Sequence, residues 1–208
     1  GAGGDVFRFI MDYEKLDFPS AVRLLADKAG VRLAWEEDGG SDRAEREALY
    51  ALNSGAADLY HRILVKAPDG AAARRYLASR DLPAEAIEAF RIGFAPDRWD
   101  TVLRWAGKDH PAERLLAAGL VVPARAAGEA EATSGKAARC YDRFRNRIMF
   151  PILDEQGRVV GFSGRVLSGD DPAAKYVNTP ETTLFRKGHL LYALHQARRA
   201  MVEALKTP

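Results

Sequence analysis

Hydrophobic positions near the start of the chain repeat at helical spacing. Apolar residues cluster over residues 6–11 and recur over residues 21–29, which predicts two short helices. Pro19, near the start of the second segment, and Gly30, just past its end, are typical of helix boundaries. The polar stretch EEDGGSDR, residues 36–43, predicts a linker and therefore a domain boundary.

The pattern changes from helical to β along residues 44–208. Residues 44–120 contain several segments with helical spacing, separated by Gly, Pro and Asp, and predict an all-helical half. Residues 121–139 show no apolar period and predict a loop, whereas residues 141–167 alternate in the way that β-strands do. We therefore expect an α+β fold, a helical layer with a small antiparallel β-sheet, divided into residues 1–35, the linker and residues 44–208.

The turn DEQG within residues 141–167 predicts how the two strands pair. If residues 155–157 form a three-residue loop with Gly157 in the left-handed conformation, the flanking residues face each other. The predicted pairs are Asp154–Arg158, Ile152–Val160, Phe150–Phe162 and Arg147–Arg165. This register brings four arginines to one face of the hairpin: Arg143, Arg145, Arg147 and Arg165.

The composition indicates that a basic site would require a local cluster of charged residues. The 208-residue chain is 47% hydrophobic and 29% charged, which is ordinary for a soluble protein with at least one core. Its net charge of +2 is too small to imply nucleic-acid binding by itself, so a basic site depends on local arrangement. The single cysteine, Cys140, excludes an internal disulfide and a cysteine-rich zinc site. No apolar run reaches the roughly 18 residues of a membrane helix, and we expect a cytoplasmic protein with no membrane partner.

The arginines of the hairpin need a negatively charged partner, because like charges opposite each other in a sheet repel. The planar donors of arginine suit phosphate oxygens, and arginines at strand spacing match the phosphates of a nucleic-acid strand. The alternative is a set of ordinary surface ion pairs with nearby carboxylates. The carboxylates in question are Asp142, Asp154, Glu155 and Glu181. The residue pattern leaves both interpretations open.

The stretch KYVNTPETTLFRKG, residues 175–188, extends the basic character into a loop. Pro180 keeps Thr179 out of the helical region, which predicts a turn. Tyr176 is a candidate for stacking on a nucleic-acid base, and burial of its ring with a bonded hydroxyl is equally compatible with the pattern.

Other conspicuous residues are predicted to be structural. Trp99 and Phe94, in RIGFAPDRW, lie beside a proline turn and are expected to anchor a helix start in the core. Asp170 and Asp171 precede Pro172 and are expected to be turn residues rather than a metal-binding pair.

Longer stretches of the sequence resemble one family. YDRFRNRIMFPILDEQGRVVGFSGRVL, followed by KYVNTPETTLFRKGHLLYAL, is similar to the segment just before the Toprim fold in bacterial replicative DNA primase of the DnaG type. YLASRDLPAEAIEAFRIGFAPDRWDTVL resembles the helical segment that precedes it in this family. GAGGDVFRFIMDYEKLDFPSAVRLLADKAG resembles the segment after the last zinc-ligand cysteine of the family's zinc ribbon. The resemblance covers nearly the whole chain, in family order.

The resemblance implies a role for each part. Residues 1–35 match the end of a zinc-binding module, and residues 44–208 match the N-terminal subdomain of the RNA polymerase core, which forms part of a basic groove. The implied function of the parent protein is synthesis of short RNA primers on single-stranded DNA during replication. The basic positions that the resemblance implies to bind nucleic acid or nucleotides are Arg80, Arg143, Arg145, Arg165, Lys175 and Lys187. We add Tyr176 and Asn178 to this predicted binding set. Arg147 and Arg186 match the family less closely.

The resemblance also implies that the chemistry of polymerisation lies elsewhere in the parent protein. The family holds Mg or Mn on acids of the Toprim fold, expected after residue 200, and zinc on a ribbon expected before Gly1. We therefore expect no catalytic residue and no bound cofactor in this chain, which alone would bind nucleic acid weakly and not polymerise. The implied partners are a single-stranded DNA template, an RNA primer, nucleoside triphosphates and, through a region absent here, the replicative helicase. The alternative is a stand-alone, non-catalytic nucleic-acid-binding module of the same fold.

Overall fold

The computed structural model describes residues 6–14, 18–31, 39–107, 109–124, 140–167, 174–188 and 192–197. The chain divides into two compact units, Gly1–Asp42 and Arg43–Pro208. The helices are α1 (Val6–Glu14), α2 (Phe18–Ala29), α3 (Gly39–Lys66), the 3-10 helix η1 (Pro68–Gly70), α4 (Ala71–Ala78), α5 (Ala84–Ala89), α6 (Thr101–Ala106) and α7 (Ala112–Ala117). The strands are β1 (Gly93–Ala95), β2 (Val121–Pro123), β3 (Cys140–Asp142), β4 (Arg147–Leu153), β5 (Val159–Val166) and β6 (Tyr176–Asn178).

The first unit contains the two predicted helices, α1 and α2. The rings of Phe7 and Phe18 lie 5.6 Å apart, and Ile10 and Ala21 are buried. Helix α2 ends at Ala29 and is followed by Gly30, whose φ of +65° is the left-handed conformation that suits glycine. The predicted helix boundary at Gly30 is therefore confirmed.

Helix α3 starts inside the stretch predicted to be a linker. Residues 39–43 are helical rather than irregular, and the division between the two compact units, after Asp42, falls within the predicted stretch. Asp42 lies in the first turn of α3, where a negative charge is favourable, and this offsets the poor helix propensity of the two glycines.

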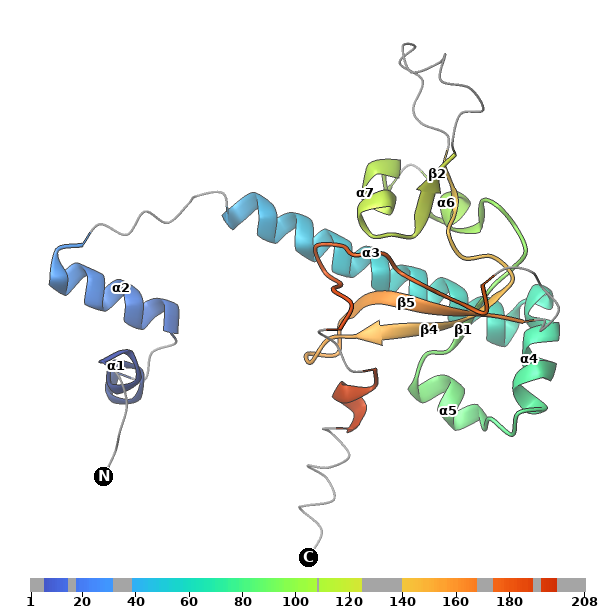
Figure 1. Cartoon of the computed structure of the whole chain (residues 1–208), viewed down its shortest axis with the longest axis horizontal. Helices are drawn as coiled ribbons and strands as arrows, with labels where there is room; N and C mark the ends of the chain where they lie inside the picture. Colours follow the sequence, from blue (N-terminus) through green and yellow to red (C-terminus); the bar gives the residue numbers. More distant parts are fainter. Residues whose placement is uncertain are drawn as a thin grey trace, which may run out of the picture. The chain divides into compact units, whose positions relative to one another are not determined.

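The second unit is built around α3 and a four-stranded antiparallel sheet of order β1-β4-β5-β6 (Figure 1). Leu49, Leu52, Ala56 and Tyr60 recur at the three- and four-residue spacing of one helical face and belong to the largest buried cluster. The Tyr60 ring packs edge-on against Phe162 of β5 at 5.7 Å. The main core of this unit therefore joins α3 to the sheet, which confirms the predicted α+β class.

Two strand pairs depart from the predicted organisation. Strand β1 interrupts the predicted all-helical half, pairing Phe94 with Ile148 of β4. Strand β2 takes up the start of the predicted loop and pairs with β3, Val121 opposite Asp142. Both strands have three residues, too few to show an alternating pattern in the sequence. Residues 125–139 of the predicted loop, and Asp170 and Asp171, lie outside the described residues.

The β4–β5 hairpin has the predicted turn but not the predicted register. Gly157 has a φ of +81°, and the Asp154 N–H donates to the Arg158 carbonyl (3.0 Å), as expected. A β-bulge between Ile152 and Leu153 then shifts the pairing by one residue. The observed pairs are Phe150–Ser163, Ile148–Arg165 and Arg147–Val166. The predicted pairs Ile152–Val160, Phe150–Phe162 and Arg147–Arg165 are therefore wrong.

Candidate nucleic-acid interface

The bulge places Arg147 and Arg165 on opposite faces of the sheet. Arg165 pairs with Ile148, so Arg147 points the other way, together with Met149. Arg147 is only 6% exposed and donates to the carbonyls of Gly164 (3.2 Å) and Ala174 (2.9 Å). The prediction that Arg147 shares a basic face with Arg165 is wrong, and Arg147 is part of the interior.

Arg165 instead belongs to a group that we call the Tyr76 cluster: Tyr76, Arg80, Arg165 and Tyr176. The guanidinium carbons of Arg80 and Arg165 lie 5.3 and 5.0 Å from the centre of the Tyr76 ring. Tyr176 pairs with Arg165 across β5 and β6 and is 55% exposed. Helix α4 and the edge of the sheet thus bring two cations and two aromatic rings together. This arrangement unites three of the predicted binding residues.

A second group, the Trp99 cluster, consists of Trp99, Tyr141 and Arg145. The Arg145 guanidinium carbon lies 4.0 Å from the centre of one Trp99 ring and 5.1 Å from that of Tyr141. The two aromatic rings meet edge-on at 5.2 Å. Arg145 lies outside the strands, because Asn146 has a φ of +50° and β4 begins only at Arg147.

The predicted burial of Trp99 is wrong, whereas that of Phe94 is confirmed. Trp99 is 61% exposed and Phe94 is 4% exposed. The segment before helix α6 therefore presents a large apolar ring to solvent with a cation above it. The sequence does not predict that Trp99 lies close to Arg145, because the two residues are far apart along the chain.

Arg143 lies between these residues in the sequence but faces a different environment. Its side chain is partly buried, and its buried Nε has no hydrogen-bond partner among the described residues. Burial lowers the pKa of its guanidinium, an effect that nearby Tyr141 partly opposes. A partly desolvated cation with an unused donor is suited to an anionic ligand.

The remaining candidates are exposed residues just before β6, on it and beyond it. Lys175 accepts a backbone hydrogen bond from Val166 through its carbonyl (3.0 Å), and its side chain is exposed. Asn178 pairs with Ser163 on the same face as Arg165 and Tyr176. Lys187 is exposed, and its backbone N–H donates to the Glu181 carboxylate at 2.9 Å.

The turn at Asn178-Thr179-Pro180 is held by a buried hydroxyl. Thr179 is fully buried, and its Oγ1 accepts a hydrogen bond from the N–H of Phe162 at 2.8 Å. This contact docks the predicted turn onto β5, so the turn holds the end of β6 beside the Tyr76 cluster.

Three of the four carboxylates proposed as alternative partners, Asp142, Asp154 and Glu181, make other contacts in the structure. Asp154 pairs with Arg158 at 2.8 Å, and Glu181 accepts a hydrogen bond from the backbone N–H of Lys187 at 2.9 Å. Asp142 is buried against α6. Ion pairs between described residues involve the side chains of Arg91, Arg98, Arg104, Arg114, Arg158 and His61, and none of the candidate cations. Ion pairs between described residues therefore do not neutralise these cations.

The described residues offer no clear position for a metal ion. They contain no group of three or more His, Cys, Asp or Glu side chains arranged to hold one. None of the helices described is both long and apolar enough to cross a bilayer.

Comparison with known proteins identifies the family. Residues 60–198 match the family model of the DNA primase catalytic core, N-terminal domain. The chain is 43% identical to a DNA primase of Pseudomonas aeruginosa over 204 residues, covering 96% of this chain and 29% of that protein. It is 41% identical to the DNA primase of Escherichia coli K12, covering 98% of this chain and 33% of the relative. The chain thus spans about a third of the length of these relatives.

Solved structures agree with the sequence comparison. A DnaG primase catalytic domain bound to single-stranded DNA is 41% identical and superposes with a TM-score of 0.66, covering 77% of this chain and 46% of that one. The zinc-binding and RNA polymerase domains of the Aquifex aeolicus primase superpose with a TM-score of 0.63 at 26% identity, covering 98% of this chain and 45% of that one. The chain belongs to the family of the N-terminal domain of the DNA primase catalytic core.

Proposed function

We propose that this chain supplies the template- and nucleotide-binding surface of a DNA primase that synthesises RNA primers on single-stranded DNA during replication. The observation that carries the proposal is the Tyr76 cluster. Its two arginines pack on an aromatic ring, and no carboxylate of the described residues pairs with them. Their remaining donors are thus available to phosphate oxygens.

The two clusters combine the features that single-stranded nucleic acids require. Arginine forks bind successive phosphates, while exposed rings offer flat surfaces on which bases stack. Tyr176 and Trp99 are both more than half exposed and lie beside Arg165 and Arg145 respectively. Lys175, Asn178, Arg143 and Lys187 are proposed to extend this surface.

The proposed division of labour leaves polymerisation to other parts of the parent protein. Acids of the Toprim fold would hold Mg or Mn for nucleotidyl transfer, and the residues of this chain would position the template, the primer and the incoming nucleotide. The first unit would be the end of the zinc-binding module, with zinc bound by residues of the parent protein. The chain alone is expected to make no primers, and the helicase would bind elsewhere.

Fluorescence anisotropy with a labelled single-stranded oligonucleotide tests the proposal. The affinity should fall steeply with salt, because each neutralised phosphate releases roughly 0.7 counterion from a single strand. Arg80→Ala, Arg165→Ala and Lys175→Ala should each weaken binding by about fivefold and flatten the salt dependence.

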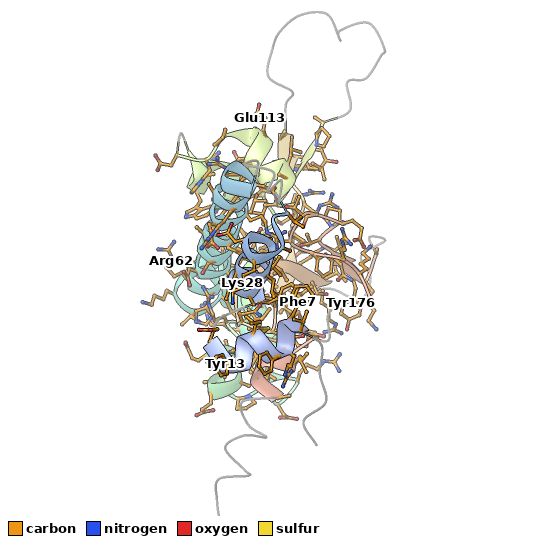
Figure 2. All side chains as sticks on the ribbon, turned by 90° about the vertical axis from the view of Figure 1, so that its left-hand side faces the viewer. Phe7, Tyr13, Lys28, Arg62, Glu113 and Tyr176 are labelled. Carbon is orange, nitrogen blue, oxygen red and sulfur yellow. The ribbon has the colours of Figure 1, made fainter. Side chains whose placement is uncertain are left out.

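Arg62→Ala is the matched control for these variants. It removes the same charge from an exposed position on α3, and Figure 2 shows Arg62 and Tyr176 on opposite sides of the view. The control should therefore bind nearly as well as the wild type. Equal losses in all four variants would indicate a general charge effect and contradict the proposed site.

A further inference from the structure

Asp142 is fully buried although it is an acidic residue with arginines on its C-terminal side. Its carboxylate accepts hydrogen bonds from the backbone N–H groups of Val102 (2.7 Å) and Leu103 (3.3 Å), in the first turn of α6. The residue that precedes the helix, Asp100, provides no side-chain cap, because its carboxylate pairs with Arg104 at 2.7 Å. A side chain forty positions along the chain therefore caps α6.

The backbone of Asp142 holds the two residues that form the cation–aromatic contact. Its N–H donates to the carbonyl of Trp99 at 2.8 Å. Its carbonyl accepts a hydrogen bond from the guanidinium of Arg145. The side chain thus fixes the residues after Trp99, while the backbone fixes Trp99 and Arg145 themselves. All of these contacts depend on the position of a single residue.

We infer that Asp142 is a positioning residue. Its buried carboxylate holds the start of α6 against β3, and Asp142 thereby keeps Trp99 and Arg145 in the arrangement that binds single-stranded nucleic acid. The inference rests on the proposed function of the Trp99 cluster. Asp142 is buried and acts through Trp99 and Arg145. Simple electrostatics makes the opposite prediction, since removing a carboxylate beside a basic surface would strengthen phosphate binding.

The variant Asp142→Asn separates these two explanations. An amide has one acceptor oxygen, and its NH2 group would face a backbone donor, so it cannot replace both hydrogen bonds. Burial raises the pKa of Asp142 to about 6, which shows that the interior disfavours the charge, and the neutral variant should therefore fold. We expect its affinity for single-stranded DNA to fall by about threefold to tenfold. An unchanged or increased affinity would overturn the inference.

A double-mutant cycle tests whether Asp142 acts through Arg145. In an Arg145→Ala background, Asp142→Asn should weaken binding little further, because the preset pair is already lost. In a Lys175→Ala background its full effect should remain. A general loss of folded protein would instead lower the affinity equally in both backgrounds. If Asp142→Asn fails to fold, Asp142→Glu enters the same cycle, since it keeps the charge and displaces the carboxylate by one methylene.

A measurement without DNA distinguishes failure of this inference from failure of the proposed function. The chain has three tryptophans, and Trp35→Phe with Trp105→Phe leaves Trp99 as the sole tryptophan, which is excited selectively at the red edge of the absorption band, where tyrosine does not absorb. Time-resolved fluorescence anisotropy should show faster local motion of Trp99 after Asp142→Asn. A wild type that binds no DNA would refute the proposed function. Unchanged Trp99 motion would refute the positioning role, whatever the DNA affinity.

Discussion

Arg147 and Arg165 carry the same side chain in opposite environments. Arg147 is buried and donates to two backbone carbonyls, whereas Arg165 packs on the partly exposed Tyr76 ring. Arg147→Ala should therefore lower the free energy of unfolding by roughly 2–3 kcal/mol. The substitution removes a hydrogen-bond donor from two backbone carbonyls and removes the buried aliphatic part of the arginine side chain. Arg165→Ala should change stability little and affect DNA binding instead. Chemical denaturation of both variants measures the difference, and similar losses of stability would contradict these assignments.

Asp142 should make stability depend on pH in an unusual direction. Burial, and secondarily Asp100, raise its pKa from 3.8 to about 6, although backbone hydrogen bonds oppose the shift. Between these values the folded protein keeps a proton that the unfolded chain has released, so stability falls as the pH rises from about 4 to 6. The contribution is on the order of 3 kcal/mol.

Asp142→Asn removes this contribution and provides the control. The stability of the wild type minus that of the variant should therefore decrease between pH 4 and pH 7, as measured by urea unfolding at several pH values. A constant difference across this range would show that Asp142 is ionised normally in the folded protein.

At the scale of elements, the crossing of β1 over α3 depends on Gly93. A Cβ atom at Gly93 would lie 2.5 Å from the Tyr60 Cβ and 2.8 Å from the His61 backbone nitrogen. Gly93→Ala should cost at least about 2 kcal/mol, because a helix backbone cannot move aside as a flexible side chain can. The melting temperature should fall accordingly.

Gly188→Ala is the matched control for this crossing. Gly188 has open space around it, but its φ of +81° disfavours alanine, so a loss of only about 1 kcal/mol is expected. Equal losses in the two variants would contradict the explanation that close packing against α3 makes Gly93 necessary.

At the scale of the whole molecule, the candidate interface belongs to the second unit, Arg43–Pro208. A truncated chain of residues 39–208 keeps all of α3 and every proposed binding residue, and it is long enough to bury its own core. We expect it to melt cooperatively and to bind single-stranded DNA within about twofold of the full chain. Calorimetry and anisotropy on the two chains measure this, and a large loss of affinity would assign a direct role to the first unit.

Local patterns were sufficient to predict the helical layer, the end of α2 and the hairpin turn at Gly157, because each depends on spacing or on the conformational freedom of one residue. Family resemblance identified Arg80 and Arg165, and the residue pattern suggested Tyr176. The fold brings these three residues together. Only the tertiary structure decided which arginines face outward. The bulge beside Leu153 shifts the pairing of β4 with β5 by one residue, so that Arg147 and Arg165 lie on opposite faces of the sheet. The cap on α6 comes from Asp142, which is far along the chain. Neither leaves a periodic signal, since both depend on contacts between residues distant in sequence.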